Sequence, residues 1–193
     1  MQPEPLANQT DEQLAAEAAR EGSDGPAFVE LLRRYRERVW RICYRLLDNA
    51  EDAHDAAQEV FVRLFTCRQQ FAGRSKYSTW VHGIAVRTSL TIRRGRSRRW
   101  KRVNTATDES LEQQAATPSA AKTREGAASL AMDLSHVLDE LNDEDRALLI
   151  LKYVEDYSYD ELAEIFELSV SACKMRISRA REKLKEKYPD LNV

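Results

Sequence analysis

The residues best suited to a chemical role lie in one basic stretch between Phe71 and Arg102. From Gly73 onward no acidic residue interrupts this stretch, although the net charge of the whole chain is only -2. Its cations are Arg74, Lys76, Arg87, Arg93, Arg94, Arg96, Arg98, Arg99, Lys101 and Arg102. The aromatic residues among them are Phe71, Tyr77, Trp80 and Trp100. Crowded cations are best tolerated beside a polyanion, and interleaved rings can stack on unpaired bases, so the stretch predicts contact with nucleic acid. The alternative is a solvated basic helix with Tyr77 and Trp80 in a core.

A helix is predicted inside this stretch. Ser78 or Thr79 could cap a helix that opens at Trp80, after a loop over residues 73–76. Its inward-facing residues would be Val81, Ile84, Ala85, Thr88 and Ile92. We therefore expect Tyr77 and Trp80 to lie beside the bases of the loop, where an unpaired strand could stack on them.

A second candidate site is the acidic segment over residues 48–65. Asn49 and Asp52 are spaced as a capping pair, and a stripe of alanines and larger apolar residues would be buried. The polar face opposite and beside that stripe holds Glu51, Asp52, Asp55, Gln58 and Glu59. Neither a second acidic helix nor a histidine cluster accompanies it, which disfavours a metal site. Two interpretations remain, a solvated face and a docking face for a basic protein partner.

The third candidate is a helix-turn-helix near the C-terminus. Ser158 and Glu161 form a capping box, residues 167–169 form a turn, and a second helix begins near Val170. The outer face of that second helix and its flanks hold Ser171, Lys174, Met175, Arg176, Ser178 and Arg179. A base-fringed second helix is typical of major-groove recognition, and a plain helical hairpin is the alternative.

These elements predict an all-α chain of two small helical domains joined by a flexible linker, the second domain being a helix-turn-helix. The 193 residues divide by composition into an N-terminal extension with a short helix (1–23), a first domain (24–102), a polar linker (103–131), a second domain (132–187) and a tail (188–193). Thr10 should cap the short helix, and Pro26 should occupy the first turn of a long one.

Several classes of function are disfavoured. No apolar run approaches the roughly 20 residues that span a bilayer, and the N-terminus lacks the pattern of a secretion signal. Cys43, Cys67 and Cys173 form no CxxC pair, which suits a reducing, cytoplasmic compartment. No phosphate-binding loop, metal-carboxylate cluster or nucleophile constellation is present, so we expect neither an enzyme nor a cofactor.

Taken in order, three segments resemble the sigma-70 family of bacterial transcription initiation factors, in particular its small extracytoplasmic-function (ECF) group. They read DAHDAAQEVFVRLF, FAGRSKYSTWVHGIAV and, within residues 141–184, LNDEDRALLILKYVEDYSYDELAEIF and KMRISRAREKL. The resemblance implies one domain for the minus-ten promoter element and one for the minus-thirty-five element. It also implies as partners core RNA polymerase, through the beta-prime clamp helices and the beta flap, promoter DNA, and an anti-sigma factor.

The resemblance assigns the candidate residues to these partners. The core-polymerase set is Asp48, Glu51, Asp52, Asp55, Gln58 and Glu59. The minus-ten set is Arg74, Lys76, Tyr77, Trp80, Arg87, Arg93 and Arg94. The minus-thirty-five set is Ser171, Lys174, Met175, Arg176, Ser178 and Arg179. The linker would run through the polymerase toward the RNA exit path.

Some positions depart from the usual family pattern. The family commonly has Asn at Arg87, often Asp near Thr91, Gly at Glu167, and Gly-Thr-Val where this chain has Ser-Ala-Cys around Ala172. A non-glycine residue with positive φ in the turn at Glu167 would cost roughly 1 kcal/mol, which a fold can absorb. These departures affect base preference and not the fold. The competing interpretation, a stand-alone helix-turn-helix regulator, leaves the acidic helix and the basic stretch unexplained.

Overall fold

The computed structural model describes residues 5–21, 25–107 and 137–189, and every regular element in these ranges is a helix. The elements are η1 (Leu6–Asn8), α1 (Asp11–Ala18), α2 (Pro26–Leu47), α3 (Ala50–Cys67), η2 (Arg68–Gln70), α4 (Tyr77–Thr107), α6 (Asp143–Tyr153), α7 (Tyr159–Phe166) and α8 (Val170–Lys187). The predicted all-α class is confirmed. The predicted tail from 190 on, and the predicted linker from 108 on, lie outside the described residues.

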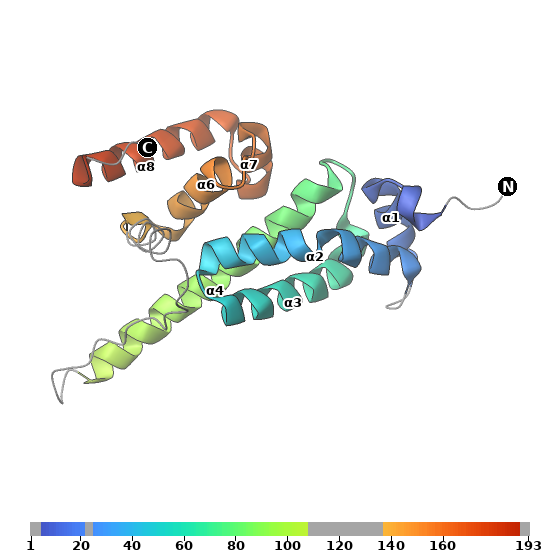
Figure 1. The fold of residues 1–193 in the computed structure, drawn as a ribbon, viewed down its shortest axis with the longest axis horizontal. Coiled ribbons are helices and arrows are strands. Elements are labelled where there is room, and N and C mark those ends of the chain that lie inside the picture. The colour runs from blue at the N-terminus through green and yellow to red at the C-terminus, as the bar shows by residue number, and fades with distance from the viewer. Residues whose placement is uncertain (1–4, 22–24, 108–136, 190–193) are drawn as a thin grey trace, which may run out of the picture.

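Helices α1 to α4 form the first bundle (Figure 1). Pro26 stands in the first turn of α2, as predicted, and Asp48 ends that helix with a left-handed φ of 56°. The Asn49 side chain then accepts from the backbone N–H of Asp52 at 3.0 Å, so the predicted cap of α3 is confirmed. Buried alanines of α3, such as Ala53 and Ala56, let it lie close against α2.

Helix α1 is tied to this bundle by polar contacts. Thr10 caps it in a capping box with Gln13, as predicted for its N-terminus. Arg34 of α2 donates to the carbonyls of Leu6, Ala7 and Gln9 and pairs with Asp11 at 2.7 Å. The segment predicted as an extension therefore packs as part of the first bundle.

Helix α4 begins three residues earlier than predicted. It starts at Tyr77, whose N–H donates to the Glu12 carboxylate of α1 at 3.2 Å, so neither Ser78 nor Thr79 is its cap. It also runs on to Thr107, past the predicted end of the domain at residue 102. Gly73, with φ of 66°, provides the left-handed turn that leads into it.

Helices α6 to α8 form the second bundle around buried leucines and isoleucines. Asn142 caps α6, and Ser158 caps α7 in the predicted capping box with Glu161. Glu167 ends α7 with φ of 56°, so the predicted turn with a non-glycine residue at positive φ is confirmed. A glutamate in this conformation costs roughly 1 kcal/mol, which the packing of the helices on both sides offsets.

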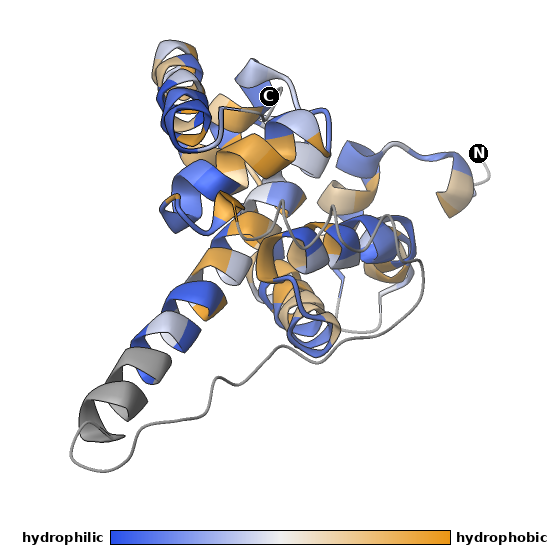
Figure 2. Ribbon diagram, turned by 60° about the vertical axis from the view of Figure 1, so that its left-hand side comes forward, coloured by the Kyte–Doolittle hydropathy of each residue, from blue (hydrophilic) through white to orange (hydrophobic). Residues whose placement is uncertain are grey.

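The second bundle lies against the first. Helix α7 packs on α4, and α6 packs on both α4 and α2, while α8 lies on the far side (Figure 1). Figure 2 shows apolar residues gathered where the helices meet, with hydrophilic turns on the projecting part of α4. Among the described residues, no helix is long and apolar enough to cross a membrane.

Candidate functional site

The outer face of α3 presents exposed acids. Glu51 and Asp55 are exposed and form no ion pair within the described residues. Gln58 is exposed and hydrogen bonds to the ring of His54 at 3.0 Å, and Glu59 pairs with Arg63 at 2.7 Å. Most of the predicted polymerase-binding set therefore shares one accessible face.

The other two members of that set point toward basic residues elsewhere. Asp52 contacts Arg96 of α4 as an ion pair. Asp48 lies between α2 and α3. Burial lowers the pKa of Arg146 in the second bundle, and the charge of Asp48 acts in the opposite direction. Asp48 and Asp52 are therefore less available to a partner than Glu51 and Asp55.

Sequence reasoning missed an aromatic pair beside this acidic face. Trp40 and Tyr44 of α2 stack with ring centroids 5.2 Å apart and planes 10° apart, and both are more than a third exposed. Trp40 borders an open groove of about 590 Å³ together with Glu51, His54 and Asp55. The spacing of Trp40 and Tyr44, four residues apart and off the buried stripe of α2, was the clue in the sequence.

Tyr77 is buried in the first bundle. Only 3% of it is exposed, and its ring meets those of Tyr35, Phe71 and Trp80 with centroids 5.1 to 5.6 Å apart. Burial raises the pKa of its hydroxyl well above the usual range. The prediction that Tyr77 stacks on an unpaired strand is therefore wrong in this conformation, because α4 starts early enough to turn the ring into the core.

The remaining residues predicted for the minus-ten element divide into two groups. Arg74 and Lys76 are exposed in and after the loop before α4, and Trp80 is half-buried against the ring of Phe71 at 5.5 Å. Arg87, Arg93 and Arg94 lie along α4 under the second bundle.

Each of these three arginines is paired with an acid of the second bundle. Arg93 binds Asp139 at 2.6 Å and Asp143 at 2.8 Å. Arg94 binds Glu144 at 2.7 Å. Arg87 donates to the carbonyl of Ile165 at 3.3 Å and lies 3.5 Å from Glu167. The positions at which the chain departs from the family pattern, Arg87 and Glu167, thus meet across the two bundles.

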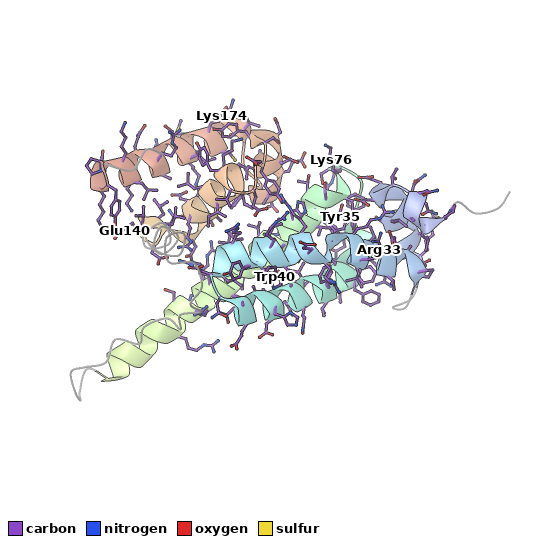
Figure 3. The ribbon with its side chains drawn as sticks, viewed as in Figure 1. Arg33, Tyr35, Trp40, Lys76, Glu140 and Lys174 are labelled. Atoms are coloured by element: carbon purple, nitrogen blue, oxygen red, sulfur yellow. The ribbon has the colours of Figure 1, made fainter. Side chains whose placement is uncertain are left out.

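The outer face of α8 is open. Ser171, Lys174, Met175, Ser178 and Arg179 are exposed, and Met175 is 55% exposed. Lys174 lies on the side of α8 turned away from the first bundle (Figure 3). Five of the six residues predicted for the minus-thirty-five element therefore form one accessible, polar and basic surface.

Arg176, predicted to flank this face, is the exception, because it is half-buried against α6. Its guanidinium pairs with Asp145 at 2.6 Å and with Glu144 at 3.0 Å, both in the first turn of α6. The hydrogen bond from Arg176 lowers the pKa of the Glu144 carboxyl. Because Glu144 also binds Arg94, these contacts link α4, α6 and α8.

Among the described residues no group of His, Cys, Asp and Glu could hold a metal ion. Cys43 and Cys173 are buried, and burial raises the pKa of the Cys43 thiol to about 11. Such a thiol is a packing residue and not a nucleophile at neutral pH. The exposed faces of α3 and α8 are suited to binding charged partners.

Each of the two bundles matches a known family model. The family model for Sigma-70 region 2 matches residues 31–99, and the model for Sigma-70, region 4 matches residues 131–184. The first bundle is thus a region 2 and the second a region 4.

Related proteins indicate which group of the sigma-70 family the chain belongs to. The chain is 32% identical over 175 residues to the ECF RNA polymerase sigma factor SigW of Bacillus subtilis, covering 87% of this chain and 92% of that protein. The chain belongs to the ECF group of the sigma-70 family.

Solved structures share the fold. A structure of CnrH in complex with the cytosolic domain of CnrY superposes with a TM-score of 0.64 at 22% identity, covering 92% of this chain and 96% of CnrH. The sigma factor RpoE in complex with the anti-sigma factor NepR from Bartonella quintana gives 0.58 at 22% identity, covering 82% and 94%.

Proposed function

We propose that this chain binds core RNA polymerase, directs it to specific promoters and helps to melt the minus-ten region. The observation that carries the proposal is the open face of α8, on the second helix of a helix-turn-helix, in a chain that also contains a region 2. The polymerase supplies the chemistry, and we expect this chain to catalyse no step itself. Its place of action is the cytoplasm, where its relatives' polymerase works.

The polymerase would dock on the open face of α3. Glu51 and Asp55 offer exposed carboxylates that no cation of the described residues pairs with, and the neighbouring Trp40 and Tyr44 offer apolar surface beside them. A helix that presents arginine or lysine satisfies both features, because a cation can pair with the acids and lie over the indole ring. Gln58 and Glu59 extend the same face along α3.

Promoter DNA would contact two surfaces. On α8, Ser171, Lys174, Met175, Ser178 and Arg179 suit base edges and phosphates in the major groove. On the first bundle, Arg74, Lys76 and Trp80 remain open, whereas Arg87, Arg93 and Arg94 need the second bundle to move away. An anti-sigma factor is a further expected partner.

Transcription with purified core polymerase tests the proposal. Core enzyme and this chain are incubated with fragmented genomic DNA, and transcript 5′ ends are mapped. A sigma factor yields new 5′ ends that share two sequence elements upstream at a constant spacing. A stand-alone regulator binds DNA but yields no transcript above core enzyme alone, and that result would refute the proposal.

Asp55→Lys tests the docking face in the same system. We expect it to weaken binding to core polymerase by roughly tenfold or more, because it places a cation where a carboxylate met a cation. Glu186→Lys is the matched control, since Glu186 is exposed on α8 and forms no ion pair in the described part of the chain. Equal affinity of the Asp55→Lys and Glu186→Lys variants for core polymerase would assign the acids of α3 to a solvated face.

A further inference from the structure

Three arginines of α2 converge on one carboxylate of the second bundle. Glu155 lies 2.8 Å from Arg38, 3.4 Å from Arg41 and 3.8 Å from Arg45, and its side chain is only 3% exposed. Its backbone carbonyl also accepts from Arg38 at 3.2 Å. One carboxylate neutralises only part of this charge, so the arginine row suits an anion with more charges than Glu155 provides.

The turn between α6 and α7 is built to present this carboxylate. Asp156 adopts a left-handed φ of 56°, and the N–H groups on either side of it donate to carbonyls near the end of α6 at 3.2 and 3.0 Å. The next residue, Tyr157, is buried, and its hydroxyl meets Nδ1 of His82 on α4 at 2.7 Å. We refer to Glu155 and Tyr157, with their partners Arg38, Arg41, Arg45 and His82, as the latch.

The contacts of α4 follow the same pattern as the latch. Arg93 and Arg94 bind Asp139, Asp143 and Glu144, which all belong to the second bundle. Carboxylates are the protein groups that most resemble phosphate oxygens in charge and hydrogen-bond geometry toward arginine. The second bundle thus fills with its own acids the positions at which promoter phosphates would bind.

We propose that region 4 closes the free chain by placing its carboxylates where promoter phosphates bind, and that Arg38, Arg41 and Arg45 join the promoter-binding surface once the latch opens. This inference rests on the proposed function. From Arg38 to Arg45 the helix rises about 10 Å, and a DNA strand carries one charge about every 3.4 Å along its axis. The row therefore has room for more than one phosphate.

The first test removes only the charge of the latch. Glu155→Gln is compared with Glu186→Gln, a change of the same kind on the exposed side of α8. The probe is a fluorescent forked DNA with a mixed-sequence single-stranded arm, because phosphate contacts are largely independent of sequence. We expect Glu155→Gln to bind this DNA about tenfold more tightly than wild type and to show a larger radius of gyration in small-angle X-ray scattering. Unchanged affinity and unchanged size would overturn the inference.

The second test asks whether the arginines bind DNA or serve only the latch. Arg41→Gln and Arg45→Gln are added to Glu155→Gln, so that the latch is already open. If the arginines contact phosphates, the triple variant binds the forked DNA less tightly than Glu155→Gln, and the slope of log affinity against log salt falls by about two units. If affinity and slope stay those of Glu155→Gln, the assignment of these arginines to the promoter surface is wrong.

Two further measurements keep the outcomes separate. Tyr157→Phe removes the hydrogen bond to His82 and keeps the ring. If Glu155→Gln fails to fold, the affinity of Tyr157→Phe for the forked DNA and its radius of gyration test the closure instead. Transcription by the wild-type chain with core polymerase tests the proposed function alone. If the wild-type chain supports transcription but neither latch variant changes DNA affinity or size, only the closure is refuted. If the wild-type chain supports no transcription, the proposed function is refuted.

Discussion

The two basic surfaces of this protein, on α4 and on α8, differ in what lies over them. On α4, Arg93 and Arg94 are bound by Asp139, Asp143 and Glu144 of the other bundle. On α8, Lys174 and Arg179 are exposed, and Lys174 lies on the side turned away from the first bundle (Figure 3). Both helices are rich in arginine and lysine. The charge of a helix therefore indicates what it can bind, and its neighbours determine whether it is available.

The same contrast separates the aromatic residue of α4 from the apolar residue of α8. Tyr77, at the start of α4, is 3% exposed among three other aromatic rings, whereas Met175 on α8 is 55% exposed. Large apolar side chains that remain exposed on a binding helix point to contact with a partner. In the free chain, α4 thus stabilises the fold while the outer face of α8 remains available.

Tyr77→Ala should produce the largest effect. Truncating a buried aromatic residue removes its packing and leaves a cavity, so we expect a loss of ~3–5 kcal/mol in the free energy of unfolding. Thermal and urea unfolding measure this loss. Tyr153→Ala is the control, because Tyr153 is 47% exposed and should change stability by less than about 1 kcal/mol. Equal, small losses of unfolding free energy for both variants would show that Tyr77 is not a core residue.

Two arginines three residues apart on α8 should differ in what their loss does. Arg179→Ala should weaken binding to a minus-thirty-five duplex by ~1–3 kcal/mol if a base contact is lost, with stability unchanged. Arg176→Ala should instead lower stability by about 1–2 kcal/mol, since it removes the cation that pairs with Asp145 and leaves Glu144 with Arg94 alone. Fluorescence anisotropy and thermal unfolding of both variants separate the two roles. Interchanged results would mean that Arg176 faces the DNA.

A smaller effect on stability is expected when the pH is lowered, because His82 lies buried between the two bundles. Burial, and then the charge of Arg38, lowers the pKa of His82 to about 4, from 6.5 in an unfolded chain. Between these values the unfolded chain binds a proton that the folded chain does not, so stability falls as pH falls from about 6.5. The groups that face the ring are Tyr35, Arg38, Tyr157 and Glu161.

From pH 7.5 to 5.5 this histidine should account for a loss of about 1 kcal/mol in the free energy of unfolding. Urea unfolding at the two pH values measures the loss, and His82→Gln should remove that part of it. An identical pH dependence in wild type and His82→Gln would show that His82 is not buried as a neutral ring.

Much of the fold followed from local chemistry. The caps at Thr10, Asn49 and Ser158 and the positive φ at Glu167 depend on a few neighbouring residues, and all four predictions are confirmed. The stripes of apolar residues likewise identified which side of each long helix is buried.

The pairing of the arginines could not be predicted in this way. The partners of Arg87, Arg93 and Arg94 in the second bundle lie 46 to 80 residues away in the chain, and no local pattern specifies how that bundle is placed. Arg176 was predicted to flank the outer face of α8 and contact DNA, but the acids at the start of α6 bind it. Tyr77 was misplaced because Glu12, from a distant helix, accepts the first N–H of α4.

The reactivity of individual arginines toward phenylglyoxal tests the central contrast most directly. Short labelling of the free chain, followed by mass spectrometry of its peptides, gives a rate for each guanidinium. The account predicts that Arg179 reacts several-fold faster than Arg93 and Arg176, because carboxylates hold the latter two. Core polymerase with promoter DNA should then protect Arg179. Equal rates for Arg93 and Arg179 in the free chain would contradict the account, because they would show that nothing covers the basic face of α4.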